Sequence, residues 1–162
     1  QVPLDIPEPR SSDVQTIARE KAFAAYAHIK KPVVVTDAVF LVFSLRGFPK
    51  AYVNFALETI GVEGILTLVA GKRRECEFQE CLAYLDGTLT EPVYFLGRFR
   101  GTLATEQRGE MKGHLWSELS RIFIPEGENE TLAEMDYQEY VTWAQLASEK
   151  DGPERKFSKW LV

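Results

Sequence analysis

Hydrophobic and polar positions alternate along the first third of the chain in a way that predicts a helix followed by a strand. After a proline-rich start over residues 1–10, apolar residues recur between positions 14 and 29 with the helical period of about 3.6. The Ser-Ser-Asp at 11–13 is typical of a helix N-cap, and Pro32 ends the helix. Residues 33–45 are then almost entirely apolar, which favours strand structure covered on both faces, as in α/β sheets.

The middle of the chain predicts a further helical stretch and a β-hairpin. Residues 50–70 are strongly apolar with a helical pattern, which Gly61 and Gly64 are expected to divide in two. Residues 74–85 alternate, with Cys76, Phe78 and Glu80 on one side of the predicted strand. An Asp-Gly turn follows, and residues 92–103 supply the partner strand of the hairpin.

The last third of the chain mixes loops with helices. Residues 104–113 read as a polar loop, and both helix and strand remain open for residues 114–124. A helix is predicted over residues 136–149, the Asp-Gly-Pro at 151–153 interrupts it, and a short amphipathic tail follows. The order of these elements predicts one α/β domain with a mixed sheet over residues 1–162.

Composition and charge exclude several classes of protein. Hydrophobic residues make up 45% of the chain and aromatic residues 12%, so it is not a disordered chain. No stretch reaches the ~20 consecutive apolar residues of a membrane span, and the start carries no secretory signal. With 19 Lys and Arg against 24 Asp and Glu, the net charge of −5 disfavours nucleic-acid binding.

The cysteines and histidines predict neither a disulfide nor a zinc site. Cys76 and Cys81 are expected to point to opposite faces of one strand, so they are poorly placed to bond to each other. Two histidines and no Cys-x-x-Cys pair do not make a zinc site. A reducing, cytoplasmic setting is therefore expected.

Three residues are candidates for chemistry. Asp37 ends a Val-Val-Val-Thr run, and ligands of open α/β sheets bind outside the carboxyl ends of strands. Glu8 could supply a second carboxylate for Mg²⁺, and Lys21 lies on the first predicted helix. Each also has a structural interpretation: a turn or capping residue for Asp37, an exposed loop residue for Glu8 and a solvated helix residue for Lys21.

Taken together, several segments resemble the inosine/xanthosine triphosphate pyrophosphatase (ITPase) family, in family order and spacing from about residue 2 to residue 162. They are similar to the family's D-L-P-E loop, Lys-bearing helix, P-V-L-V-E-D strand, L-x-G-x-P turn, Y-x4-L helix and F-x-P-x-G…T-x-A-E-M segment. In this chain these are residues 4–8, 17–22, 32–37, 45–49, 52–71, and 123–127 with 131–135.

The resemblance implies both a fold and an activity. The fold would be the Maf/Ham1-type α/β fold, an elongated two-lobed domain with a central mixed, twisted sheet flanked by helices. The activity would be Mg²⁺-dependent hydrolysis of ITP, XTP and dITP to the monophosphate and pyrophosphate by a homodimer. By the same resemblance Glu8 and Asp37 would be metal ligands, Asp37 would also lie near the attacking water, and Lys21 would face the phosphates.

The chain also departs from the family pattern. It contains no T-G-N-x-x-K-x-x-E motif, so we expect a domain without the family's N-terminal strand–loop–helix. Counted from the A-E-M, the S-H-R motif that reads the base falls on Ala-Gln-Leu at 144–146. The F-G-[YW]-D-P segment is replaced by residues 115–121, where Trp116 could stack on a base and Glu118 could stand in for the Asp. Core or rim positions are the alternative interpretation of both residues.

These departures lead to two expectations for function. The first is a degenerate ITPase-like domain with weak or no pyrophosphatase activity and no cofactor, acting as a nucleotide-binding or protein-interaction module. The second is an active Mg²⁺-dependent nucleoside triphosphate pyrophosphatase of altered specificity, with Glu8, Asp37 and Lys21 in its site. Whether the chain is an enzyme is thus left open. Its expected partners are a purine nucleoside triphosphate and a second copy or another protein, without nucleic acid or membrane.

Overall fold

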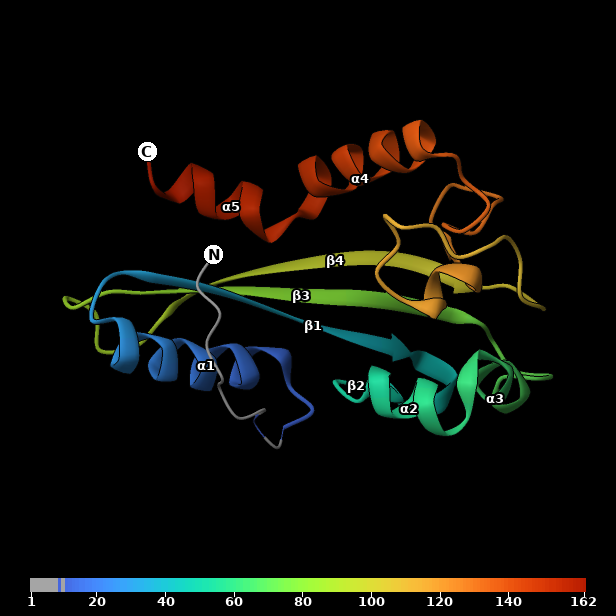
Figure 1. Ribbon diagram of the computed structural model, residues 1–162, viewed down its shortest axis with the longest axis horizontal. Coiled ribbons are helices and arrows are strands. Elements are labelled where there is room, and N and C mark those ends of the chain that lie inside the picture. The colour runs from blue at the N-terminus through green and yellow to red at the C-terminus, as the bar shows by residue number, and fades with distance from the viewer. Residues whose placement is uncertain (1–8, 10) are drawn as a thin grey trace.

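An antiparallel sheet forms the centre of the protein, and helices lie on both sides of it (Figure 1). The computed structural model describes residue 9 and residues 11–162. In chain order the elements are α1 (Val14–Ile29), β1 (Val33–Val42), the 3₁₀ turn η1 (Phe43–Leu45), β2 (Pro49–Lys50), α2 (Val53–Thr59), α3 (Gly61–Leu68), β3 (Glu75–Leu85), β4 (Val93–Leu103), the 3₁₀ turn η2 (Glu118–Arg121), β5 (Phe123–Pro125), α4 (Tyr137–Asp151) and α5 (Pro153–Trp160).

The strands are ordered β2-β1-β3-β4-β5, and each neighbouring pair of the described strands is antiparallel. The prediction of an α/β fold is confirmed, but these pairings do not include the parallel pair that a mixed sheet requires. The apolar run after Pro32 predicts a strand covered on both faces, within a mixed sheet. Instead β1 pairs along its length with β3, and it meets β2 only near its end, at Phe40 and Leu41.

Two hydrophobic clusters give the molecule its elongated form. Helix α1 packs its alanine-rich face on the odd-numbered residues of β1. It also packs on the face of β3 that carries Cys81 and Leu85. The second cluster lies toward the other end of the sheet, where Phe40, Phe78 and Phe123 meet α3 and the loop before β5. Figure 1 shows α1 and the α2–α3 pair on one side of the strands, with α4 and α5 on the other.

Local signals in the sequence account for most helix boundaries. The Asp13 carboxylate caps α1 by accepting a hydrogen bond from the Thr16 amide at 2.8 Å. The apolar stretch after β2 divides at Gly61, as predicted, where the backbone has φ +64°. Asp136 and Glu139 form a reciprocal capping box at the start of α4. Residues 114–124, left open above, contain η2 and β5.

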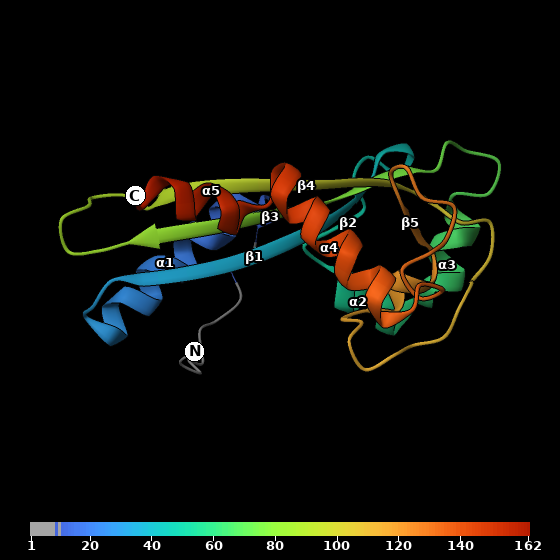
Figure 2. The ribbon, with the colours of Figure 1, turned by 90° about the horizontal axis from the view of Figure 1, so that it is seen from above.

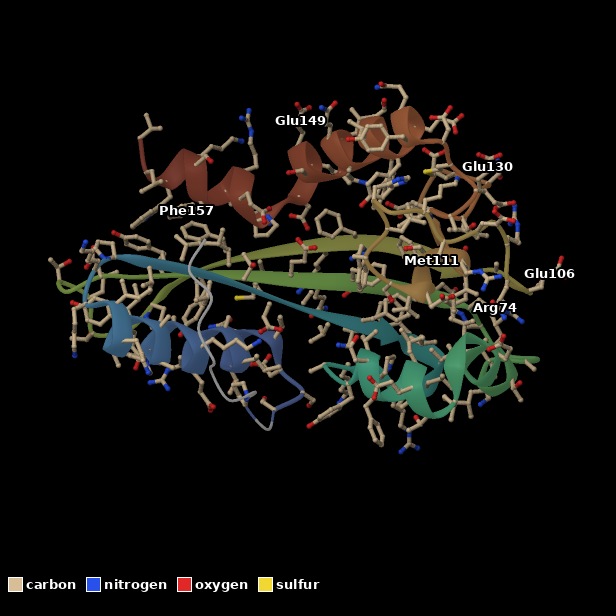
Figure 3. The ribbon with its side chains drawn as sticks, in the orientation of Figure 1. Arg74, Glu106, Met111, Glu130, Glu149 and Phe157 are labelled. Atoms are coloured by element: carbon tan, nitrogen blue, oxygen red, sulfur yellow. The ribbon has the colours of Figure 1, made fainter. Side chains whose placement is uncertain are left out.

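The C-terminal helices cover the outer edge of β4. The backbone N–H of Arg98 donates a hydrogen bond to the Asp151 carboxylate at 3.0 Å, and Lys156 donates to the carbonyl of Leu96. Phe157 of α5 lies against the rings of Tyr84 and Phe95 (Figure 3). Figure 2 shows α5 over the strands and α4 continuing toward β5. The break at 151–153 therefore bends the chain so that polar groups reach the edge of the sheet.

The two cysteines are free and buried, in different hydrophobic clusters, as the strand alternation predicts. Burial raises the pKa of the Cys76 thiol, and it raises that of Cys81 to about 11. Neither thiol is therefore a ready nucleophile at neutral pH. Within residue 9 and residues 11–162, none of the helices has both the length and the apolar character needed to cross a membrane.

Candidate functional site

A pocket of about 530 Å³ lies at the edge of β1, between the start of α1 and the start of α2. This is the part of β1 that precedes its pairing with β2, so side chains from both faces of the strand reach the pocket. Its walls include an acid, several aromatic rings and a small residue: Asp37, Ala38, Phe40, Tyr52, Phe55 and Trp116.

An ion pair lies at the α1 side of this pocket. The Lys21 ammonium contacts Oδ2 of Asp37, and the side chains are only 19% and 14% exposed, respectively. The other oxygen of Asp37, Oδ1, accepts a hydrogen bond from the Ala38 amide at 3.1 Å. Strand β1 runs without a break through Asp37, so the interpretation of this residue as a turn between two strands is wrong. The interpretation of Lys21 as a solvated helix residue is wrong as well.

The aromatic wall of the pocket includes Trp116. Its indole packs edge-on against Phe78, with ring centroids 4.9 Å apart, yet it is 56% exposed. Tyr52 and Phe55 on the other wall are also exposed. Exposed aromatic rings around a cavity of this size are suited to stacking on a flat ligand.

The other predicted site residues are placed differently. Glu118 begins η2, is exposed and pairs with Arg121 at 3.3 Å, and it does not line the pocket. Glu8 lies outside the described residues. The structure therefore joins Asp37, Lys21 and Trp116 around one pocket, whereas Glu118 is not among its lining residues.

The described residues supply at most part of a Mg²⁺ site. Among them no group of three or more His, Cys, Asp or Glu side chains could hold a metal ion. Mg²⁺ needs fewer protein ligands than that, because it usually binds one or two carboxylates and completes its shell with water and phosphate oxygens. Asp37 is a buried carboxylate whose Oδ2 has no hydrogen-bond donor in the described chain besides its ion pair with Lys21. It therefore fits the role of such a ligand.

A largely buried acid lies near the pocket, on the face of the sheet opposite to the Asp37 side chain. Glu80 of β3 pairs in register with Ala38, a residue of the pocket wall, and lies two residues from Phe78 on the same face. Burial, and then the nearby charge of Glu154, raise the pKa of Glu80 to about 7. The sequence contained a signal for it, since strand alternation put a carboxylate on the same side as Cys76 and Phe78.

Replacing Glu80 by glutamine should stabilise the fold at alkaline pH. A carboxyl whose pKa is higher in the folded than in the unfolded state loses stability as pH rises from about 4.5 to about 7. Glutamine cannot ionise, so we expect Glu80→Gln to raise the free energy of unfolding by about 1–2 kcal/mol at pH 8 and by little at pH 4.5. Urea denaturation at both pH values measures the difference. A gain that is equal at the two pH values would contradict this assignment.

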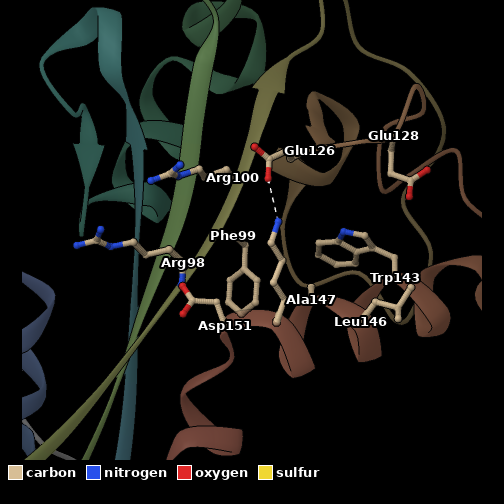
Figure 4. A pocket seen from close by; sticks show the side chains of 10 residues that line it. Arg98, Phe99, Arg100, Glu126, Glu128, Trp143, Leu146, Ala147 and Asp151 are labelled. Atoms are coloured by element: carbon tan, nitrogen blue, oxygen red, sulfur yellow. Dashed lines mark hydrogen bonds and ion pairs between the residues drawn. The ribbon is translucent and has the colours of Figure 1, made fainter.

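The positions that counting assigns to the S-H-R motif lie elsewhere. Residues 144–146 belong to α4, and Leu146 lines a second cavity of about 470 Å³ together with Phe99 and Trp143 (Figure 4). Lys150 and Glu126 form an ion pair of 3.1 Å across that cavity. It opens at the edge of β4, and β3 separates β4 from β1 in the sheet. The lining residues of the Asp37 pocket therefore include none of these three positions.

Sequence comparison with a family model and with individual proteins finds the same kind of relative. The model of the Ham1 family matches residues 1–143. A dITP/XTP pyrophosphatase of Saccharolobus solfataricus is 38% identical over 82% of this chain and 66% of its own length. The corresponding protein of Thermococcus kodakarensis is 34% identical over 99% of this chain and 82% of its own length. The chain thus spans about two thirds to four fifths of these relatives.

Solved structures show the same fold. A nucleoside-triphosphatase / dITP/XTP pyrophosphatase from Mycobacterium abscessus matches with a TM-score of 0.76 over 93% of this chain and 80% of that one, at 20% identity. A HAM1 protein from Coxiella burnetii matches with a TM-score of 0.73 over 91% and 80% of the two chains, also at 20% identity.

Proposed function

Since this chain belongs to the Ham1 family, we propose that it is a nucleoside triphosphate pyrophosphatase that cleaves purine triphosphates to the monophosphate and pyrophosphate. The observation that carries the proposal is the Lys21–Asp37 ion pair at the α1 side of a pocket with an aromatic wall. The first expectation above, a degenerate module without activity, has no support in the described site. The two central charged residues of the site, Lys21 and Asp37, are present and in contact.

Asp37 and Lys21 would have different roles in the reaction. Asp37 would hold Mg²⁺ with the phosphates, and it would orient the water that attacks the α-phosphorus. Lys21 would bind phosphate oxygens and stabilise the charge that develops as the α–β bond breaks. A bound Mg²⁺ would supply charge neutralisation on the triphosphate. In the structure these side chains neutralise each other, so substrate binding would exchange one ion pair for contacts to the phosphates.

The pocket also supports a purine nucleotide as substrate. A volume of about 530 Å³ lies within the range of roughly 300–1,000 Å³ that small-molecule sites occupy. Trp116 would stack on the base at one end, while Lys21 and Asp37 would meet the phosphates at the other. Glu8, which lies outside the described residues, remains the proposed second carboxylate, and Glu118 remains a proposed contact from outside the pocket wall.

A direct assay tests the activity. The protein is incubated with Mg²⁺ and ITP, XTP or dITP, and released pyrophosphate and orthophosphate are measured separately. We expect pyrophosphate, at a turnover on the order of 10 s⁻¹, and loss of activity when EDTA removes the metal. Release of orthophosphate instead, or no product with any of the three, would contradict the proposal.

A homodimer and a cytoplasmic location belong to the same proposal. The exposed aromatic residues of α2 and the two free cysteines are compatible with them. Light scattering at micromolar concentration measures the oligomeric state, and a monomer would count against the dimer.

A further inference from the structure

We propose that a groove beside α4 is a docking site for a basic, amphipathic segment of a partner protein. This groove, which we call the α4 groove, lies between α4 and the turn that follows β5. It consists of the cavity of about 470 Å³ described above and a neighbouring cavity of about 290 Å³, which share Glu128, Trp143 and Leu146 in their walls. The inference does not rest on the proposed activity, because neither cavity shares a lining residue with the Asp37 pocket.

Helix α4 leaves apolar side chains without cover. None of its 15 residues is buried, whereas α1, with 16 residues, buries five. Trp143 and Phe99 are only partly buried where they pack against the core. Leu146, about one turn beyond Trp143, is 62% exposed and lines both cavities. Because a helix of a folded protein normally buries its apolar stripe, these side chains indicate a surface that another molecule covers.

The charges around the groove that lack a partner are negative. Glu128 lies in the wall of both cavities, and Glu130 lies in the wall of the smaller one. Among the residues that the structure describes, no cationic side chain pairs with either of these carboxylates. Lys150 is a cation in the wall, but it already pairs with Glu126 at 3.1 Å.

Two arginines of β4 also line the larger cavity, but their side chains extend toward the other face of the sheet. Side chains alternate along β4, so Phe99 faces α4 while Arg98 and Arg100 face the opposite way. Arg100 pairs there with Glu77 of β3 at 3.6 Å. Figure 4 shows both arginine side chains directed away from Trp143. The groove therefore has an apolar floor and a rim of carboxylates.

This combination fits a segment that carries apolar side chains next to Lys or Arg. The apolar side chains would pack on Trp143 and Leu146, as in other grooves that bind amphipathic helices. The cations would pair with Glu128 and Glu130. A nucleotide is disfavoured, because its phosphates would meet the same carboxylates. A second copy of this chain is disfavoured as well, because its own basic amphipathic helix, α5, already packs its aromatic side of the helix on β3 and β4.

Binding of a synthetic peptide to the full chain tests the inference. The probe is a fluorescein-labelled peptide of about 14 residues, composed of Lys with Leu at helical spacing. One control peptide has Glu in place of every Lys, and the other has Ser in place of every Leu. Fluorescence anisotropy measures binding. We expect a dissociation constant on the order of 10 µM for the probe and binding at least about tenfold weaker for both controls.

Charge-reversal variants of the protein locate the binding site. Glu128→Lys combined with Glu130→Lys should weaken binding of the probe about tenfold or more. Glu58→Lys combined with Glu106→Lys makes the same change in net charge at exposed positions that line neither cavity. This matched pair should weaken binding less than about twofold. Leu146→Ser should also weaken binding several-fold, and its fold should be kept because the side chain is mostly exposed.

Three results would overturn the inference. The first is that the Leu–Lys peptide does not bind the wild-type protein. The second is an equal loss of binding in the two charge-reversal pairs, which would show that the peptide responds only to net charge. The third is equal binding of the peptide with Ser in place of Leu, which would show that apolar contacts play no part. Asp37→Asn should bind the probe like the wild type, because Asp37 lines neither cavity.

Discussion

Replacing Asp37 by asparagine is expected to lower the rate of pyrophosphate release by about 10²–10³-fold, with little change in the fold. Asparagine keeps the shape of the side chain but removes the negative charge that the proposed metal and the attacking water require. It also leaves the Lys21 ammonium, only 19% exposed at the side chain, without its anionic partner. Initial rates with ITP at saturating Mg²⁺ measure the effect, and circular dichroism checks that the protein is folded.

Glu20→Gln provides the matched control for this experiment. Glu20 precedes Lys21 on α1, is exposed and is not among the residues that line the pocket, so its loss should change the rate less than twofold. If Asp37→Asn retains more than about a tenth of the wild-type rate, Asp37 is not a ligand of the reacting groups and the proposed mechanism is wrong.

Truncating Phe40 to alanine should have the largest effect on stability. The ring is completely buried, lies 4.5 Å from that of Phe78 and contacts Phe123 edge-on. Removing a buried phenylalanine ring costs about 3–5 kcal/mol, because apolar burial is lost and a cavity remains. Unfolding by urea, followed by tryptophan fluorescence, measures the loss.

Phe40→Leu is the control for this truncation. Leucine fills most of the volume of the ring, so this variant should lose only about 1–1.5 kcal/mol. Phe40 also forms part of the pocket wall, and the alanine variant should therefore bind nucleotide less tightly as well. Equal stability of the two variants would show that the cluster around Phe40 can collapse to fill the space.

The elements of the fold were largely predictable because their signals are local. The Ser-Ser-Asp before α1, the glycine that divides α2 from α3, and the alternation along β3 each act within a few residues of where they occur. The direction of strand pairing was not predictable in this way. An apolar run of the length of β1 suits a buried strand of either kind, and only its partners, which are distant in sequence, make the sheet antiparallel.

The site residues could be predicted only in segments that resemble a motif of the family. Asp37 and Lys21 were both identified because each lies in a segment that resembles a family motif, and the structure shows their side chains in contact. Glu118 was proposed as a stand-in for the Asp of the family's F-G-[YW]-D-P segment, but it begins the 3₁₀ turn η2, is exposed and does not line the pocket. Alternation along β3 predicted which face of the strand Glu80 occupies, but its closeness to Ala38 of the pocket wall depends on the strand register, which no local pattern reveals.

The attachment of the last two helices to β4 has a consequence for the lifetime of the protein in solution. The amide of Arg98 and the carbonyl of Leu96 are satisfied by side chains of residues 151 and 156, not by another strand. If thermal fraying or proteolysis released α4 and α5, these backbone groups would be free to recruit strands from other molecules. Self-association should therefore begin at the C-terminal end, before the hydrophobic interior melts.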